Sequence, residues 1–215
     1  MEYIPQIVFV LIAGFFGFLI YRRISQISKN IKLGKDVDLS GNKAERLRTM
    51  LLVAFGQKKM FKRPIPAFLH LLIYVGFILI NIEVLEIVID GVFGTHRVAA
   101  PVLGGLYVGM INFFELLAVG VLFSCVVFLI RRNILRINRF KKIEMVGWPS
   151  LDANLILIIE ILLMVAILGM NGADQILQER GADHYTQVGS FFFSSSMFGW
   201  LFQFETGTLI FVERA

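Results

Sequence analysis

One histidine lies where an imidazole could hold a redox cofactor. His70 falls inside a long apolar stretch, and an imidazole can ligate the iron of a haem held between membrane helices. A b-type haem of this kind needs two imidazoles at matching depth on neighbouring helices. Lys62 and Arg63 precede His70 by one to two helical turns, where cationic groups can neutralise haem propionates. We therefore treat these three as candidate haem-binding residues; the alternative for His70 is a hydrogen bond to a backbone carbonyl.

The two faces of this stretch carry further polar groups. At 100° per residue, the face of His70 also carries Tyr74, Phe77 and Asn81, which could line a cofactor or quinone pocket. The opposite face carries Glu83, Glu86 and Asp90 at i, i+3 and i+7, for which we expect structural or interfacial roles.

Two carboxyl groups, Glu115 and Glu160, lie near the middle of other apolar stretches that contain no Lys or Arg. An unpaired carboxylate in hydrocarbon is prohibitively costly. Each group must therefore be protonated, hydrogen-bonded to another helix, or opposed by a group from outside this chain. Protons accompany electrons to quinone, so Glu115 and Glu160 are candidate proton or quinone contacts. Plain hydrogen bonding between helices is the alternative.

The other reactive side chains predict no further site. His96 and His184 lie between apolar stretches, show no metal-ligand spacing, and are expected to be solvated loop residues. The single cysteine, Cys125, cannot form an internal disulfide or hold an iron-sulfur cluster, and we expect it to pack as a small apolar side chain. No nucleotide-binding loop, zinc-protease motif or nucleophile elbow occurs.

The elements that must position these residues are membrane helices. The 215 residues are 57% hydrophobic and 17% charged, against roughly 45–50% and 25% in soluble domains. Four stretches without Lys or Arg are long enough to cross a bilayer as helices: 4–21, 65–89, 103–130 and 151–170. We predict an all-α, polytopic transmembrane bundle of four full spans plus the start of a fifth.

The charges of the loops predict the orientation. Loop 22–64 holds twelve basic and three acidic residues, and loop 131–150 holds six and one, whereas segments 90–102 and 171–205 hold one basic residue each. The positive-inside rule places both basic loops in the cytoplasm and the N-terminus outside. We therefore predict a multi-pass protein of the inner (cytoplasmic) membrane. The net charge of +5 therefore indicates a membrane surface rather than nucleic acid.

Loop 22–64 also contains an amphipathic pattern. Apolar residues recur at helical spacing behind a Ser40 cap, at Leu47, Met50, Leu51, Ala54 and Phe55. We predict a helix that lies on anionic lipid or, alternatively, docks a partner domain. Segment 171–215 is predicted to be an outer segment, with an interfacial or re-entrant stretch over 187–204 and a truncated fifth helix that begins at 206.

Two long runs resemble a known family. They are FGQKKMFKRPIPAFLHLLIYVGFILINIEVLEIVIDGVFGTHR (55–97) and RFKKIEMVGWPSLDANLILIIEILLM (139–164). Together they resemble the N-terminal membrane region of heterodisulfide-reductase-related iron-sulfur oxidoreductases, which is similar to the gamma subunit of respiratory nitrate reductase, a five-helix cytochrome b. The resemblance implies transfer of electrons between soluble donors and membrane quinone, through 4Fe-4S clusters in a domain that follows the fifth span.

The resemblance also assigns individual residues. His70 matches the haem b ligand of the second helix near the cytoplasmic face, whereas Ile80 occupies the place of the outer ligand. The fifth-helix ligand and the cluster cysteines would come from a continuation or a partner chain. We therefore expect the membrane anchor and electron-transfer portion of a quinone-linked iron-sulfur oxidoreductase, not catalytic alone, with lipid, quinone and a cytoplasmic iron-sulfur domain as partners. The alternatives are a non-redox anchor that recruits a cytoplasmic partner and, less favoured, a small transporter.

Overall fold

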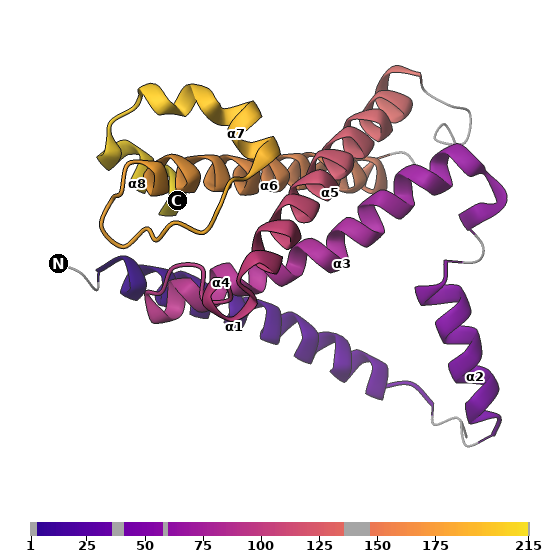
Figure 1. The fold of residues 1–215 in the computed structure, drawn as a ribbon. Helices are drawn as coiled ribbons and strands as arrows, with labels where there is room; N and C mark the ends of the chain where they lie inside the picture. Colours follow the sequence, from indigo (N-terminus) through magenta and orange to yellow (C-terminus); the bar gives the residue numbers. More distant parts are fainter. Residues whose placement is uncertain (1–3, 36–40, 58–59, 136–146, 215) are drawn as a thin grey trace. The chain divides into compact units, whose positions relative to one another are not determined.

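The regular elements of the chain are helices. The computed structural model describes residues 4–35, 41–57, 60–135 and 147–214, and no strand occurs among them. Four helices are long and apolar enough to cross a membrane (Figure 1): α1 (Ile4–Lys32), α3 (Pro64–Phe93), α5 (Gly105–Leu129) and α6 (Trp148–Glu179). The predicted all-α class and the four predicted spanning helices are confirmed.

Two of these helices run well beyond their apolar stretches. Helix α1 continues past Tyr21 to Lys32, and α6 continues past Met170 to Glu179. Hydropathy marks only the part of a helix that suits lipid, whereas the backbone hydrogen bonds continue until a cap or turn ends them. The last turns of α6 are therefore continuous with a long apolar helix, and the assignment of residues 171–215 to the outer side stays a prediction.

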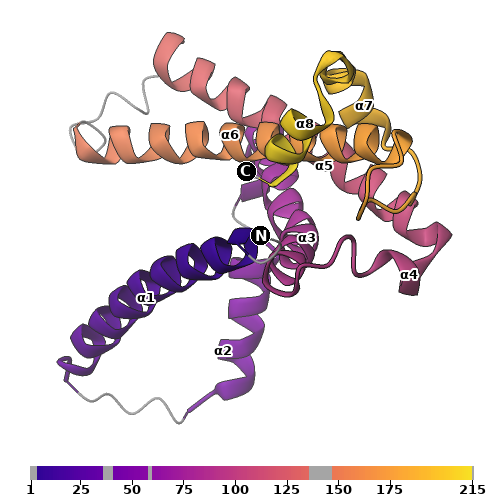
Figure 2. The same ribbon diagram turned by 90° about the vertical axis from the view of Figure 1, so that its left-hand side faces the viewer.

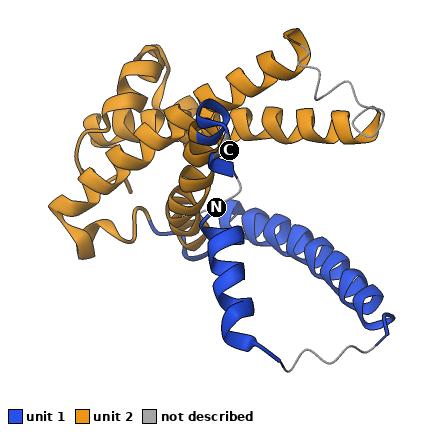
Figure 3. Ribbon diagram, turned by 90° about the vertical axis from the view of Figure 1, so that its right-hand side faces the viewer, with its two compact units in different colours: residues 1–67, 91–95 blue, residues 68–90, 96–215 orange. Residues whose placement is uncertain are grey.

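The chain divides into two compact units, coloured separately in Figure 3. Unit 1 comprises residues 1–67 and 91–95, and unit 2 comprises residues 68–90 and 96–215. In unit 1, the predicted amphipathic segment forms α2 (Lys43–Met50), which continues as a π-helix, η1 (Leu51–Phe55), with its apolar side chains exposed. The short 3₁₀ helix η2 (Met60–Lys62) follows. Ser40, the predicted cap, lies outside the described residues.

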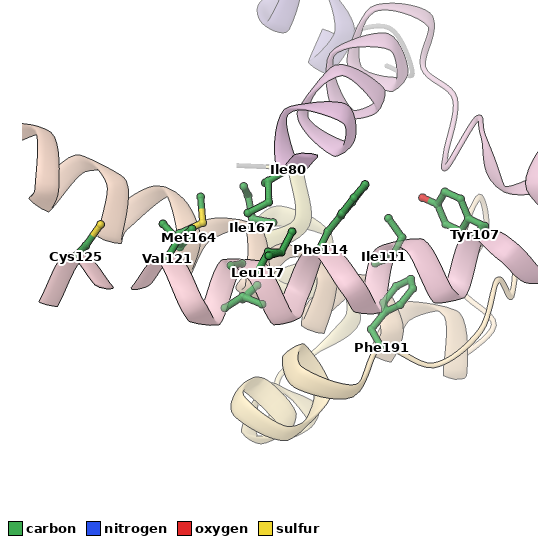
Figure 4. Close-up of a cluster of buried hydrophobic side chains, with 12 residues drawn as sticks. Ile80, Tyr107, Ile111, Phe114, Leu117, Val121, Cys125, Met164, Ile167 and Phe191 are labelled. Atoms are coloured by element: carbon green, nitrogen blue, oxygen red, sulfur yellow. The ribbon is translucent and has the colours of Figure 1, made fainter. Parts of the chain in front are cut away.

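Unit 2 is built around α5 and α6. Twelve buried side chains form its main apolar cluster (Figure 4). Ile111, Leu117 and Val121 come from α5, and Met164 and Ile167 come from α6. Cys125 is fully buried in the same cluster, so it packs as the predicted small apolar side chain.

The part of unit 2 that follows α6 folds back along this helix. Helix α7 (Phe192–Phe198), the 3₁₀ helix η6 (Gly199–Gln203) and α8 (Thr206–Arg214) all contact α6, as Figures 1 and 2 show. Two of the side chains buried beside α6 are Leu201 and Leu209. The stretch 187–204, predicted to be interfacial or re-entrant, contains two short helices, and its place relative to a membrane stays a prediction. A helix begins at Thr206, the predicted start of the last helix.

The remaining helical pieces flank α5. The single turn α4 (Ala100–Leu103) precedes it, and a π-helix, η3 (Ile130–Ile134), continues it toward the basic loop. Helix α5 packs closely on α3 at Gly76, where a Cβ atom would overlap the Val121 side chain. Small residues permit such close approach between membrane helices.

We expect Gly76→Leu to lower the free energy of unfolding by about 1–3 kcal/mol, because the added side chain must displace Val121 or separate the helices. Gly109→Leu in α5 is the matched control, since nothing lies within 4 Å of a Cβ at that position. Unfolding by SDS in mixed micelles measures the difference, and equal stability of the two variants would contradict this packing.

Candidate functional site

A buried guanidinium organises the polar groups at one end of unit 2. Arg97 is 5% exposed and is the only Lys or Arg with a buried side chain in the described part of the chain. It lies 2.9 Å from Oδ2 of Asp174 and 3.5 Å from Oε1 of Glu83. It also donates hydrogen bonds to Oδ1 of Asn171 at 2.6 Å and to the hydroxyl of Tyr107 at 3.3 Å. We call these residues, with the groups bonded to them below, the Arg97 cluster.

Neighbouring groups stabilise the charged form of Arg97. Burial by itself would lower the pKa of Arg97, but Asp174, Tyr107 and Glu83 outweigh that effect and raise the pKa above its usual value. The ring of Phe191 also lies 5.2 Å from the guanidinium carbon and shields the cation. Arg97 therefore remains protonated at any pH at which the protein is folded.

The loop after α3 is held so that Arg97 points into the bundle. Arg97 has φ 52°, a left-handed conformation that is uncommon for a residue with a side chain. Asp90 fixes this turn because its carboxylate accepts hydrogen bonds from the backbone N–H groups of Arg97 at 2.8 Å and Val98 at 3.3 Å. Glu86 accepts from the N–H of Ala99 at 3.0 Å and from the Tyr107 hydroxyl at 2.7 Å.

Helix α6 contributes a polar stripe to the same cluster. The residues at i, i+3, i+4 and i+7 are Asn171, Asp174, Gln175 and Gln178, and all are buried. Gln178 donates to Asp174 at 3.1 Å, and its side-chain oxygen accepts from the N–H of Val188 at 2.9 Å. Gln175 accepts from the backbone N–H of Phe191 at 2.8 Å, so this stripe also holds the segment that leads to α7.

Glu115, a predicted proton or quinone contact, is 1% exposed within this cluster. Its Oε2 accepts from the N–H groups of Phe193 and Ser194, at 3.0 and 3.2 Å, in the first turn of α7. Asn171 donates to Oε1 of Glu115 at 3.4 Å and to Oε1 of Glu83 at 2.9 Å. The groups that meet Glu115 therefore come from this chain, although its role toward protons or quinone stays a prediction.

The expectation that His96 is a solvated loop residue is wrong. Its side chain is 8% exposed, and Nε2 lies 2.7 Å from Oδ1 of Asp174. The ring also packs edge-on against Tyr185, with centroids 4.9 Å apart. The turn that buries Arg97 also places its neighbour against α6, an effect that local sequence does not reveal. His184 is exposed, as predicted, and its ring centroid lies 6.0 Å from that of His96.

The predicted haem ligand lies on an open face of α3. The side chain of His70 is exposed, as are those of Phe77 and Asn81 on the same helix face. Asn81 bonds the carbonyl of Phe77 in its own helix, whereas His70 has no hydrogen-bond partner among the residues that the structure describes. The alternative of a carbonyl-bonded His70 therefore finds no support in this part of the chain.

The other predicted site residues are spread over several elements of the chain. Arg63 is exposed just before α3, and Lys62 ends η2 with a side chain outside the described part. Both belong to unit 1, and their role toward a haem stays a prediction. Glu160 is partly exposed on α6 and has no hydrogen-bond partner within the described ranges; its role toward protons or quinone also stays a prediction.

A bis-histidine haem site is not complete within the described chain. His70 and Asp90 are separated along α3 by roughly 30 Å of helical rise, and His96 lies beyond Asp90 with Nε2 already on Asp174. His184 is beside His96 rather than near His70. The described residues thus offer one imidazole that could hold a haem, but not the two that a bis-histidine site needs. No group of three His, Cys, Asp or Glu in the described residues could hold a metal ion.

The sequence carries a signal for the Arg97 cluster that reasoning about single spans misses. Polar residues at helical spacing occur on α3 at Glu83 and Glu86 and on α6 from Asn171 to Gln178. Two polar stripes that lie at the same depth on neighbouring helices predict a buried polar interface. Arg97, the single basic residue of the short loop after α3, is the cation that could enter such an interface.

The fold and this cluster define a multi-pass helical membrane protein with a buried polar network at one end of its bundle. The chain is similar to a probable iron-sulfur-binding oxidoreductase of Bacillus subtilis (strain 168), FadF, with 26% identity over 187 residues. The match covers 86% of this chain and 25% of the relative, so the chain spans about a quarter of that protein's length. No family model and no solved structure matches the chain.

We expect Arg97→Gln to lower the free energy of unfolding by about 3–5 kcal/mol, because it leaves Asp174 and Glu83 buried without their cation. Arg97→Lys should recover only part of the lost stability, since an ammonium group lacks the planar set of N–H donors with which a guanidinium reaches several acceptors. Arg23→Gln, at an exposed position of α1, is the control. The free energy of unfolding is measured in mixed micelles. Equal values for Arg97→Gln and Arg23→Gln would contradict the central role of Arg97.

Proposed function

We propose that this chain is the membrane portion of a quinone-linked iron-sulfur oxidoreductase, which passes electrons between a cytoplasmic iron-sulfur domain or subunit and quinone. The observation that carries the proposal is the similarity to FadF along 86% of a chain whose four long helices suit a membrane. In this proposal a cytoplasmic partner domain or subunit would hold the iron-sulfur clusters, because a cluster needs several cysteine ligands and this chain has one cysteine. The single, fully buried Cys125 is consistent with that division.

The exposed imidazole supports the electron-transfer role. A histidine on a lipid-spanning helix is costly unless something satisfies it, and His70 has no such partner in the described residues. We infer that His70 would be one of the residues that hold a haem b, together with a histidine from outside the described chain. Such a group, when bound, would supply one-electron chemistry. Exposed Phe77 and Asn81 would flank it on the same helix face.

Basic residues assign the membrane side. The positive-inside rule places loops 22–64 and 131–150 in the cytoplasm and the Arg97 cluster near the outer face. The amphipathic segment α2–η1 carries exposed Arg46 and Arg48 together with exposed Leu47, Leu51 and Phe55. This combination suits anionic lipid of the inner leaflet, which would bring the segment beside the cytoplasmic iron-sulfur partner.

The haem assignment predicts the visible spectrum of the protein isolated from its own membranes with its co-purifying subunits. The dithionite-reduced minus oxidised spectrum should show a haem b band that His70→Ala removes while the protein still accumulates. His184→Ala, which changes an exposed histidine at the other end of unit 2, should leave the band unchanged. A haem-free spectrum of the assembled complex would instead favour a non-redox anchor that recruits a cytoplasmic partner.

The orientation predicts which cysteines react from outside an intact cell. In a Cys125→Ala background, Asp183→Cys should react with a membrane-impermeant maleimide in intact cells with a permeable outer envelope. Thr49→Cys, exposed in α2, should react only after the inner membrane is opened. The reverse pattern would place the N-terminus in the cytoplasm and overturn the assignment of sides.

A further inference from the structure

The charges of the Arg97 cluster do not balance. Four carboxyl groups, those of Glu83, Glu86, Glu115 and Asp174, are linked through hydrogen bonds or ion pairs and are buried. Arg97 is the one buried Lys or Arg in the described ranges. Even with His96 protonated beside Asp174, two cations cannot neutralise four carboxylates, and an uncompensated carboxylate in a low-dielectric interior takes up a proton instead. The cluster must therefore hold protons.

Glu83 and Glu115 are where a proton is best shared. The same amide nitrogen of Asn171 donates to Oε1 of Glu83 at 2.9 Å and to Oε1 of Glu115 at 3.4 Å. Two carboxylates that meet at one donor repel each other, and a proton on either group removes that repulsion. Arg97 lies 3.5 Å from Glu83, so the position of its charge decides how easily the pair releases the proton.

His96 and Asp174 form a dyad on the other side of Arg97. Nε2 of His96 is 2.7 Å from Oδ1 of Asp174, whereas Nδ1 is buried and has no hydrogen-bond partner in the described part of the chain. An imidazole bonded to a carboxylate at one nitrogen can accept a proton at the other nitrogen and release one to the carboxylate. Exposed His184 lies beside this ring, at the boundary with solvent.

We propose that the Arg97 cluster is a proton-exchange site, with the Glu83–Glu115 pair as the store and the His96–Asp174 dyad as the port. During local opening, a hydronium ion at the solvent boundary marked by exposed His184 transfers a proton to Nδ1 of His96, and the proton of Nε2 passes to Oδ1 of Asp174. Because neutral Asp174 no longer forms an ion pair with Arg97, the guanidinium then stabilises ionised Glu83, and the pair releases its proton to water or to a reduced quinone. Arg97 thus transmits charge between the dyad and the pair without carrying a proton itself.

Besides the four carboxyl groups, further titratable groups face the cluster or its neighbours and contribute to its total charge. They are Asp90 of α3, Tyr107 of α5, Glu179 of α6, His184 and Tyr185 of the following loop, and Glu213 of α8. The final acceptor, a quinone that has received electrons, rests on the proposed function. The binding of protons by the cluster does not.

The test uses the full chain in phosphatidylglycerol–phosphatidylcholine vesicles without quinone or redox partner. Infrared spectra at neutral pH, where exposed carboxyl groups are ionised, should still show the C=O stretch of a protonated carboxyl group, shifted downward in D₂O. Glu83→Gln or Glu115→Gln should remove this band, whereas Asp152→Asn, which changes an exposed carboxyl at the start of α6, should keep it. A band that persists in both Glu variants would contradict the assignment of the Glu83–Glu115 pair as the site that holds the proton.

The port is tested by the rate of the shift in D₂O. His96→Gln retains a hydrogen-bond donor for Asp174 but cannot relay a proton, and we expect it to slow the exchange on the order of 100-fold. An unchanged rate, with a helical circular-dichroism spectrum unchanged from wild type, would overturn the port. Glu115 also accepts hydrogen bonds from the first turn of α7, so Glu115→Gln can fail to fold. In that case Glu83→Gln alone tests the loss of the infrared band. A haem-free protein that retains the band would count against the proposed function only.

Discussion

The structure of unit 2 depends on the need to satisfy one buried cation and several buried carboxyl groups inside an apolar bundle. No water is available within a membrane to solvate such groups, so each must find its partners in the protein. Arg97 meets acceptors from α5 and α6 and a carboxylate of α3, and Asn171 links Glu83 to Glu115. The three spanning helices are therefore joined by polar contacts at one end, beyond the apolar cluster that joins them along their length.

The same requirement explains features of the chain that hydropathy does not. Helix α6 extends to Glu179 because its last polar turns are buried against partners rather than released into water. The segment after α6 folds back since Gln175, Gln178 and Glu115 accept its backbone N–H groups. Those hydrogen bonds satisfy donors that an irregular segment would otherwise leave unpaired. Helix α7 is thus positioned by side chains of α5 and α6.

The sequence predicted the elements well and the polar cluster poorly. Long apolar stretches suffice to locate the spanning helices, because every polar residue in lipid raises the free energy of insertion. Loop charges predict the orientation of these helices. The burial of His96 and Arg97 depends instead on a left-handed turn and on acceptors more than seventy residues away, at Asn171 and Asp174. Single-span reasoning found Glu115 but looked for a cation within the spans, whereas the cation comes from the loop between them.

The two faces of α3 differ in what they still require. Glu83 and Glu86 face groups of their own unit, and their oxygens accept bonds from Asn171, Tyr107 and the backbone. On the opposite face, Asn81 bonds its own helix, which leaves His70 as a polar group that the described residues do not satisfy. A lipid-facing imidazole without a partner would oppose insertion of the helix. The exposed His70 face is therefore the place on α3 where a further helix or a cofactor would gain most by binding.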